Sequence, residues 1–149
     1  MVGEKFSHLS DIPPMKYKHL ILRGEVKNSL LLKDLHFLRS WAHDLVELIG
    51  MELLVLPQAA YCDNVNRRRA SLFAILTNSH LSLHISDDSD PAMIDFDLCS
   101  SAPFLIDDVL SKINVFSLGR YEYYLLNRDH FMSHTAKIGL YPESRTASI

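Results

Sequence analysis

Residues 80–86, HLSLHIS, and residues 93–99, MIDFDLC, decide the fold, because each alternates between apolar and polar side chains. The apolar positions are Leu81, Leu83, Ile85, Ile94, Phe96 and Leu98. A period of two places successive side chains on opposite faces of a strand. The residues between the two stretches, DDSDP at 87–91, favour a turn. The sequence therefore predicts two strands joined by a turn, each with one apolar face and one polar face.

Outside these strands, two segments have the periodicity of a helix. Apolar residues recur at steps of three and four from residue 31 to residue 49, which forms one stripe along a helix. Asn28 or Ser29 can cap the start of this helix, and Gly50 can end it. A second, shorter helix is predicted within residues 104–116.

The remaining apolar runs predict four more strands, at residues 16–26, 52–62, 71–77 and 120–128. Pro57 inside the second of these favours an edge position or a bulge. Residues 63–69, DNVNRRR, are interpreted as a loop. The predicted order is β-α-β-β-β-β-α-β, an α+β fold. Two helices cannot cover both faces of such a sheet, so we expect a two-layer sandwich, with a largely antiparallel sheet and both helices on one face. The other face then needs a partner, which favours a dimer or a functional surface.

Length and composition indicate one domain, because 149 residues with 48% hydrophobic side chains can bury a single core. We expect a loose N-terminal arm at 1–15, the domain at 16–129 and a C-terminal tail at 130–149. The net charge of −3 gives no general attraction to nucleic acid or to anionic membranes. The chain has no apolar run of membrane-spanning length and no signal-peptide core at its start. Its two cysteines lie 37 residues apart, a spacing of neither a zinc site nor a disulfide framework, so we expect a cytoplasmic protein.

The polar face of residues 80–86 admits three kinds of chemistry. His80, Ser82 and His84 are spaced like ligands on one strand face, but no specific further ligand completes a metal site. A Ser–His–Asp hydrolase is possible in composition, although the chain lacks the G-x-S-x-G turn that exposes such a serine.

The third chemistry is self-cleavage, and it fits the sequence better. A serine that starts a strand at a strained junction can attack the carbonyl before it, which turns the peptide bond into an ester. A nearby histidine then removes the serine Cα proton, and the remaining dehydroalanine hydrolyses to a pyruvoyl group. Ser79 stands at the start of the strand with histidines close by, so the chain has the side chains for this reaction.

The same residues resemble a known family. SHLSLHI at 79–85, followed by IDFDLC at 94–99, resembles the prokaryotic-type pyruvoyl-dependent S-adenosylmethionine decarboxylases. The family pattern is Ser-His-Leu-Ser/Thr-Ile-His with a cysteine twenty residues after the first serine, and Cys99 lies twenty residues after Ser79. A second serine stands eight residues before the reactive one, as Ser71 does here. KHLIL at 18–22 resembles the first strand of the family; the resemblance covers about residues 16–129, and its specific part is 71–99.

The resemblance implies roles for individual residues. The chain is cleaved between Asn78 and Ser79, and Ser79 becomes the pyruvoyl group, so the cofactor comes from the chain and neither a metal nor pyridoxal phosphate is expected. Ser71 assists processing, and His84 serves as the base at the Cα of Ser79. Cys99 returns a proton to the substrate carbon after carbon dioxide leaves. The substrate amine condenses with the ketone as a Schiff base, which drains electrons from the departing carboxylate.

The implied function is decarboxylation of S-adenosylmethionine to the aminopropyl donor of spermidine biosynthesis, by a homodimer of cleaved protomers. The chain departs from the family at Asn78, where the family has Glu, and at Ser86, where it has an aromatic residue. Asp88 replaces a substrate-binding Glu and is one methylene shorter.

Two alternatives follow from these departures. Asp87, Asp88 and Asp90 favour a basic amino acid, ornithine or arginine, as the substrate of a pyruvoyl decarboxylase with the same fold. Asn78 favours a non-cleaving, non-catalytic homologue that acts as a partner subunit.

Overall fold

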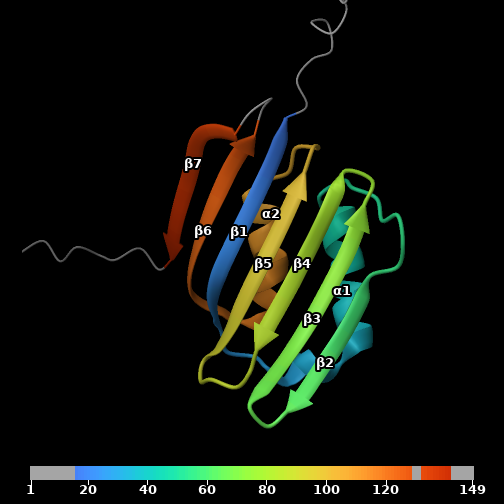
Figure 1. Cartoon of the computed structure of the whole chain (residues 1–149), viewed down its shortest axis with the longest axis vertical. Helices are drawn as coiled ribbons and strands as arrows, with labels where there is room; N and C mark the ends of the chain where they lie inside the picture. The colour runs from blue at the N-terminus through green and yellow to red at the C-terminus, as the bar shows by residue number, and fades with distance from the viewer. Residues whose placement is uncertain (1–15, 129–131, 142–149) are drawn as a thin grey trace, which may run out of the picture.

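The fold is a single antiparallel sheet with two helices packed on one of its faces (Figure 1). The computed structural model describes residues 16–128 and 132–141. The elements are β1 (Tyr17–Val26), η1 (Leu30–Lys33), α1 (Leu35–Leu48), β2 (Gln58–Asn64), β3 (Arg67–Leu76), β4 (Ser79–Ser86), β5 (Ala92–Ser100), α2 (Ile106–Ile113), η2 (Asn114–Phe116), β6 (Leu118–Arg128) and β7 (Met132–Tyr141). The strands lie in the order β2-β3-β4-β5-β1-β6-β7. The predicted α+β class and the predicted element order are confirmed.

Strands β4 and β5 form as their alternating pattern predicts. Leu81 lies opposite Leu98, and Leu83 lies opposite Phe96, so the apolar residues of both strands fall on the face toward the helices. Their side chains are at most 1% exposed. Burial of each such side chain stabilises the fold by roughly 1.5–3 kcal/mol, and this core fixes the register of the two strands.

Helix α1 begins later than the sequence predicts. Its N-cap is Asp34, whose side chain accepts a hydrogen bond from the backbone N–H of Phe37 at 2.9 Å. Neither Asn28 nor Ser29 caps it, because the 3₁₀ turn η1 intervenes between them and the helix. The C-terminal end agrees with the prediction, since Gly50 has a φ of +71°, a conformation that glycine adopts without strain.

The strands also differ from the prediction at three places. β2 starts after Pro57 and not at residue 52, although its place at the edge of the sheet agrees with the prediction. Arg67–Arg69 belong to β3 and not to a loop, because β2 and β3 pair as far as Asn64 opposite Arg67.

The third difference lies in residues 130–149, where the sequence suggests only a tail. Residues 132–141 form β7, which pairs with β6. In its sequence, MSHTAKIGLY, four of the five alternate positions 132, 134, 136, 138 and 140 are apolar, and the exception is a histidine at 134. The predicted arm at 1–15 and residues 142–149 of the predicted tail lie outside the described residues.

The sheet face opposite the helices is open to solvent. Four large side chains on it, Ile21, Phe73, Ile75 and Tyr124, are between 40% and 46% exposed. A face with several exposed large apolar side chains favours contact with another surface. In the part of the chain that the structure describes, no helix has the length and hydropathy needed to cross a membrane.

Candidate functional site

The junction between β3 and β4 holds the predicted reactive serine in an unusual backbone conformation. Leu76 pairs with Ser79, so Thr77 and Asn78 form the tight turn between the strands. Ser79 has a φ of +149°, a region that favours glycine. A residue with a side chain held in such a region carries roughly 1–3 kcal/mol of strain. The strained residue therefore directly follows the peptide bond that self-cleavage would break.

The carbonyl before Ser79 is held by two donors from the end of β5. The oxygen of Asn78 accepts a hydrogen bond from the backbone N–H of Ser101 at 3.1 Å. The hydroxyl of Ser101 lies 3.5 Å from the same oxygen. Donors placed on a carbonyl oxygen polarise it and stabilise the negative charge that forms there during attack. Sequence analysis missed Ser101, because no local pattern reveals that the end of β5 reaches this turn.

His80 lies against the reactive serine on the open face. The Oγ of Ser79 is 3.2 Å from the Nδ1 of His80, and the Nε2 of His80 is 3.6 Å from a carboxylate oxygen of Asp97. His19 binds the other oxygen of Asp97 through its Nε2 at 2.7 Å. The sequence predicts that His80 and Asp97 share the polar face of the hairpin, but their connection to Ser79 depends on the strand register.

Cys99 lies beside this group on β5. It pairs with His80 in the register and is 3% exposed. Arg128 of β6 donates a hydrogen bond from its guanidinium to the Cys99 Sγ at 2.7 Å. The structure thus brings Ser79 and Cys99 to neighbouring positions on adjacent strands, and it adds Arg128, which sequence analysis did not find.

Ser71 and His84 form a second pair, separate from Ser79. The Oγ of Ser71 is 2.9 Å from the Nδ1 of His84, and the two residues are opposite each other on β3 and β4. His84 is five residues from Ser79 along the same strand, which corresponds to about 16 Å at 3.3 Å per residue. Within one chain, His84 therefore does not reach the Cα of Ser79.

Asp88 follows β4 at the end opposite to Ser79. It lines a polar hollow of about 350 Å³ together with Lys27 and Arg68. Nine residues separate it from Ser79, so it does not meet that serine within one chain. The structure groups Asp88 with the His84 end of β4.

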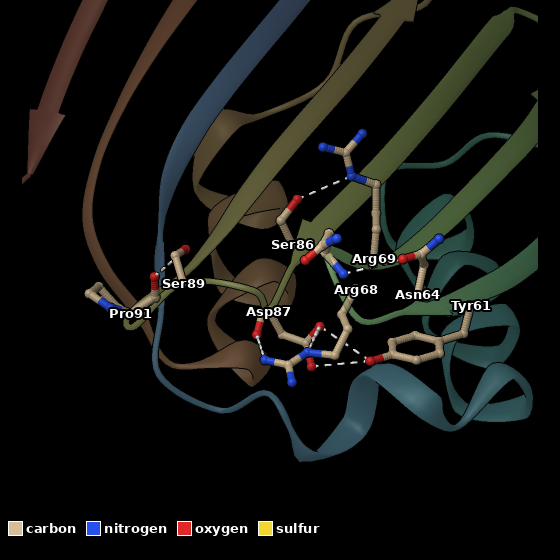
Figure 2. Close-up of polar contacts among 9 residues, drawn as sticks. Tyr61, Asn64, Arg68, Arg69, Ser86, Asp87, Ser89 and Pro91 are labelled. Carbon is tan, nitrogen blue, oxygen red and sulfur yellow. Dashed lines mark hydrogen bonds and ion pairs between the residues drawn. The ribbon is translucent and has the colours of Figure 1, made fainter.

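The neighbouring Asp87 anchors this end of the hairpin (Figure 2). Its carboxylate accepts hydrogen bonds from the hydroxyl of Tyr61 at 3.2 Å, and its carbonyl accepts one from Arg68 at 2.6 Å. Burial, and after it the charge of Asp87, raise the pKa of Tyr61 above its ordinary value. Arg69 donates to the Ser86 hydroxyl at 3.1 Å. These contacts tie β2, β3 and the β4–β5 turn together.

The open face carries an acidic hollow of about 410 Å³. Three carboxylates line it, those of Asp95, Asp97 and Glu122, with Arg23 as their one cationic neighbour in the lining. His84 also lines this hollow. An excess of negative groups in a concave site attracts cationic ligands.

Ser79, the residue expected to become the pyruvoyl group, lies diagonally across the β4–β5 border from Cys99. Among the described residues, one group of three side chains brings possible metal ligands within 4.8 Å of one another, the exposed His43, Asp44 and Glu47. It lies on α1, on the other side of the sheet from Ser79, and an exposed acidic group of this kind is common without a metal.

The arrangement is suited to rearranging the peptide bond before Ser79, because strain, a polarised carbonyl and a histidine converge there. No protein-family model matches the chain, and it matches no curated protein.

Proposed function

We propose that the chain is a self-processing, pyruvoyl-dependent decarboxylase that acts on S-adenosylmethionine and produces the aminopropyl donor for spermidine biosynthesis. The observation that carries this proposal is the Asn78–Ser79 junction, where a strained serine follows a carbonyl already hydrogen-bonded to Ser101. The pattern of Ser71, Ser79, His84 and Cys99, which resembles the decarboxylase family, supports the choice of substrate.

Processing takes place in two stages. In the first, a bond forms between the Oγ of Ser79 and the carbonyl carbon of Asn78, the C–N bond breaks, and the freed amine takes a proton. In the second, a base removes the Cα proton of Ser79, the Cβ–Oγ bond breaks, and residues 1–78 leave with a carboxylate end. Water then adds to the dehydroalanine and ammonia leaves, so residue 79 ends as a ketone. The donors on Ser101 stabilise the oxyanion of the first stage.

The base of the second stage comes, in this proposal, from a second copy of the chain. His84 of the same chain is about 16 Å from Ser79, at 3.3 Å per residue, whereas the exposed open face can pack against another sheet. A two-fold dimer is self-complementary, so the His84 end of one strand can meet the Ser79 end of the other. When the Nδ1–H of His84 donates to the hydroxyl of Ser71, the Nε2 is left unprotonated and can act as the base. Asp88 lies at the same end as His84 and would enter the site with it.

The residues around Ser79 suit a pyruvoyl group. Such a group supplies an electrophilic carbonyl that binds the substrate amine and draws off the electron pair released with carbon dioxide. Cys99 is buried beside it and can deliver one proton to the substrate carbon. Arg128 lies at 2.7 Å from the Cys99 Sγ and can attract the substrate carboxylate. We place this enzyme in the cytoplasm, in keeping with its free cysteines Cys62 and Cys99.

A second candidate substrate is a basic amino acid, ornithine or arginine. The acidic hollow on the open face favours it, because Asp95, Asp97 and Glu122 outnumber the single Arg23. The processing chemistry is the same in both cases, and only the binding of the substrate side chain differs.

Intact mass spectrometry of the purified protein tests the processing. The chain should split into fragments of 78 residues and 149 − 78 = 71 residues. The shorter fragment should resist Edman sequencing, because a ketone replaces its amine. Ser79→Ala, which lacks the nucleophile, should remain intact under the same conditions. A single uncut mass for the wild-type protein after prolonged incubation would contradict the proposal and favour a non-cleaving partner subunit.

Release of labelled carbon dioxide from three substrates tests the specificity of the cleaved protein. Release from S-adenosylmethionine, but not from ornithine or arginine, supports the first candidate. Release from ornithine or arginine, but not from S-adenosylmethionine, would be consistent with the pyruvoyl mechanism and would contradict the proposed substrate.

A further inference from the structure

His80 has no role in the function proposed above, although its imidazole lies within 3.2 Å of the hydroxyl of the reactive serine. We propose that His80 is the base that activates Ser79 for its attack on the Asn78 carbonyl, and that Asp97 is the residue that positions it. This inference rests on the proposed function and divides the two stages of processing between two histidines. His80 serves ester formation, and His84 serves the later elimination.

The contacts of His80 match the needs of a base at this step. Its Nδ1 lies 3.2 Å from the Ser79 Oγ, within reach of the hydroxyl proton. The Nδ1 accepts that proton only if the ring proton stands on the Nε2. The Nε2 faces the carboxylate of Asp97 at 3.6 Å, and a carboxylate there favours this tautomer and stabilises the imidazolium that forms.

The position of the ring is fixed from two sides. Phe73 of β3 stacks on the imidazole of His80, with ring centroids 5.8 Å apart and planes at 20°. Asp97 is itself held by His19 of β1, whose Nε2 lies 2.7 Å from the second carboxylate oxygen. Side chains of four adjacent strands, β3, β4, β5 and β1, therefore hold the imidazole of His80 in place beside the hydroxyl of Ser79.

Ester formation needs no proton donor or acceptor from outside the chain. The Ser79 Oγ gives its proton to the Nδ1 of His80 as the Oγ–C bond forms. His80 then gives the proton to the Ser79 nitrogen as the C–N bond to Asn78 breaks. The result is an isomer of the original chain, an ester in place of an amide, and the step needs no co-reactant.

Trapping of the ester with neutral hydroxylamine tests this step apart from the elimination. The parent for the experiment is the full-length His84→Ala variant, in which elimination is blocked and the ester accumulates. Hydroxylamine cuts an ester at residue 78 and leaves Ser79 with a free amine. The chain contains no Asn–Gly bond, the peptide bond that hydroxylamine cuts most readily, so the cut at residue 78 is specific.

In this parent, His80→Ala should slow ester formation by about 10²-fold or more, as expected for loss of a general base. Added imidazole should restore part of the rate in His80→Ala. His80→Gln, which keeps the bulk of the side chain, should be slow as well and should show no such rescue. Asp97→Asn should give a smaller decrease. Combined with His80→Ala, it should slow the reaction no further, because a positioning residue acts only through its base.

His43 and Asp44 provide the matched control. Their side chains also approach to 3.6 Å, but they are exposed on α1. His43→Ala and Asp44→Asn should form the ester at the rate of the parent.

Two outcomes would overturn the inference. One is ester formation at the parental rate in both His80 variants. The other is an additive loss in the double variant together with no rescue by imidazole. Either outcome leaves the proposed function intact if the wild-type protein cleaves. If the wild-type protein never cleaves and no ester can be trapped, the proposed function fails as well.

Discussion

Two uncleaved variants of Ser79 should reveal the strain that the junction holds. Ser79→Ala and Ser79→Gly both remove the nucleophile, and both lose the contact with His80. They differ in backbone freedom, because alanine at a φ of +149° stays strained and glycine does not. The glycine variant should therefore be the more stable of the two, although glycine in a strand ordinarily lowers stability.

The expected difference in stability between the Ser79→Gly and Ser79→Ala proteins is the sum of two opposing contributions. Relief of the strained conformation contributes roughly 1–3 kcal/mol. The greater flexibility of glycine in the unfolded chain opposes this by roughly 0.4–1 kcal/mol. The net gain is then about 0.5–2 kcal/mol, which corresponds to a rise in Tm of about 2–6 °C for a domain of this size.

Thermal unfolding of the two variants, followed by circular dichroism, measures the difference. Ser82 serves as the control position, because it lies within the same strand and is absent from the described residues with a positive φ. There, the glycine variant should be less stable than the alanine variant by roughly 0.5–1 kcal/mol. If the Ser79→Gly protein melts at or below the temperature of Ser79→Ala, the junction is not strained and this support for self-cleavage is lost.

Three further predictions concern the site and its surroundings. Cys99→Ala should still cleave, but its turnover, measured as release of labelled carbon dioxide, should fall by about 10²-fold or more if the thiol is the proton donor. Full activity of this variant would show that Cys99 only packs in the core. Asp88→Asn should leave self-cleavage intact and mainly raise KM with S-adenosylmethionine, whereas with a basic amino acid it should remove a charge-assisted contact of roughly 1.5–3 kcal/mol. Asp87→Asn should lower the pKa of Tyr61 toward its ordinary value, since the carboxylate helps to raise it. The pKa of Tyr61 is measured from tyrosinate absorbance as a function of pH, after subtraction of the absorbance of a Tyr61→Phe protein. A tyrosine whose pKa is higher in the folded than in the unfolded chain lowers the stability of the fold at alkaline pH. The Asp87→Asn protein should therefore lose less stability there than the wild type.

The sheet was predictable from the sequence wherever the alternation of side chains is strong. β4, and β5 as far as Leu98, alternate as predicted, whereas Cys99 at the end of β5 is buried although it belongs to the predicted polar face. The start of α1 was not predictable, because Leu31 and Leu32 continue the apolar stripe while the backbone forms a 3₁₀ turn. β7 was missed because its pattern is weak, as is common for a strand that pairs on one side only.

The site was predictable only where its parts lie close in sequence. The resemblance assigns both Ser71 and His84 to processing, and the structure brings these two side chains together on the β3–β4 hairpin. The remaining contacts join strands that are distant in the chain, such as His19 with Asp97 and Arg128 with Cys99. These contacts exist because β1 inserts between β5 and β6, and no local pattern predicts that insertion. The separation of His84 from Ser79, by contrast, follows from the sequence once the strand is predicted, because five residues of one strand span about 16 Å at 3.3 Å per residue.

The insertion of β1 also determines what a cut after residue 78 does to the molecule. The first fragment would keep β1, α1, β2 and β3, and the second would keep β4, β5, α2, β6 and β7. β1 of the first fragment would remain paired on both sides with strands of the second, while β3 would remain paired with β4. The two fragments would therefore be interlocked through three strand–strand borders and a shared core. After cleavage, the two fragments would therefore stay associated as one folded protomer, and they would separate only in denaturant.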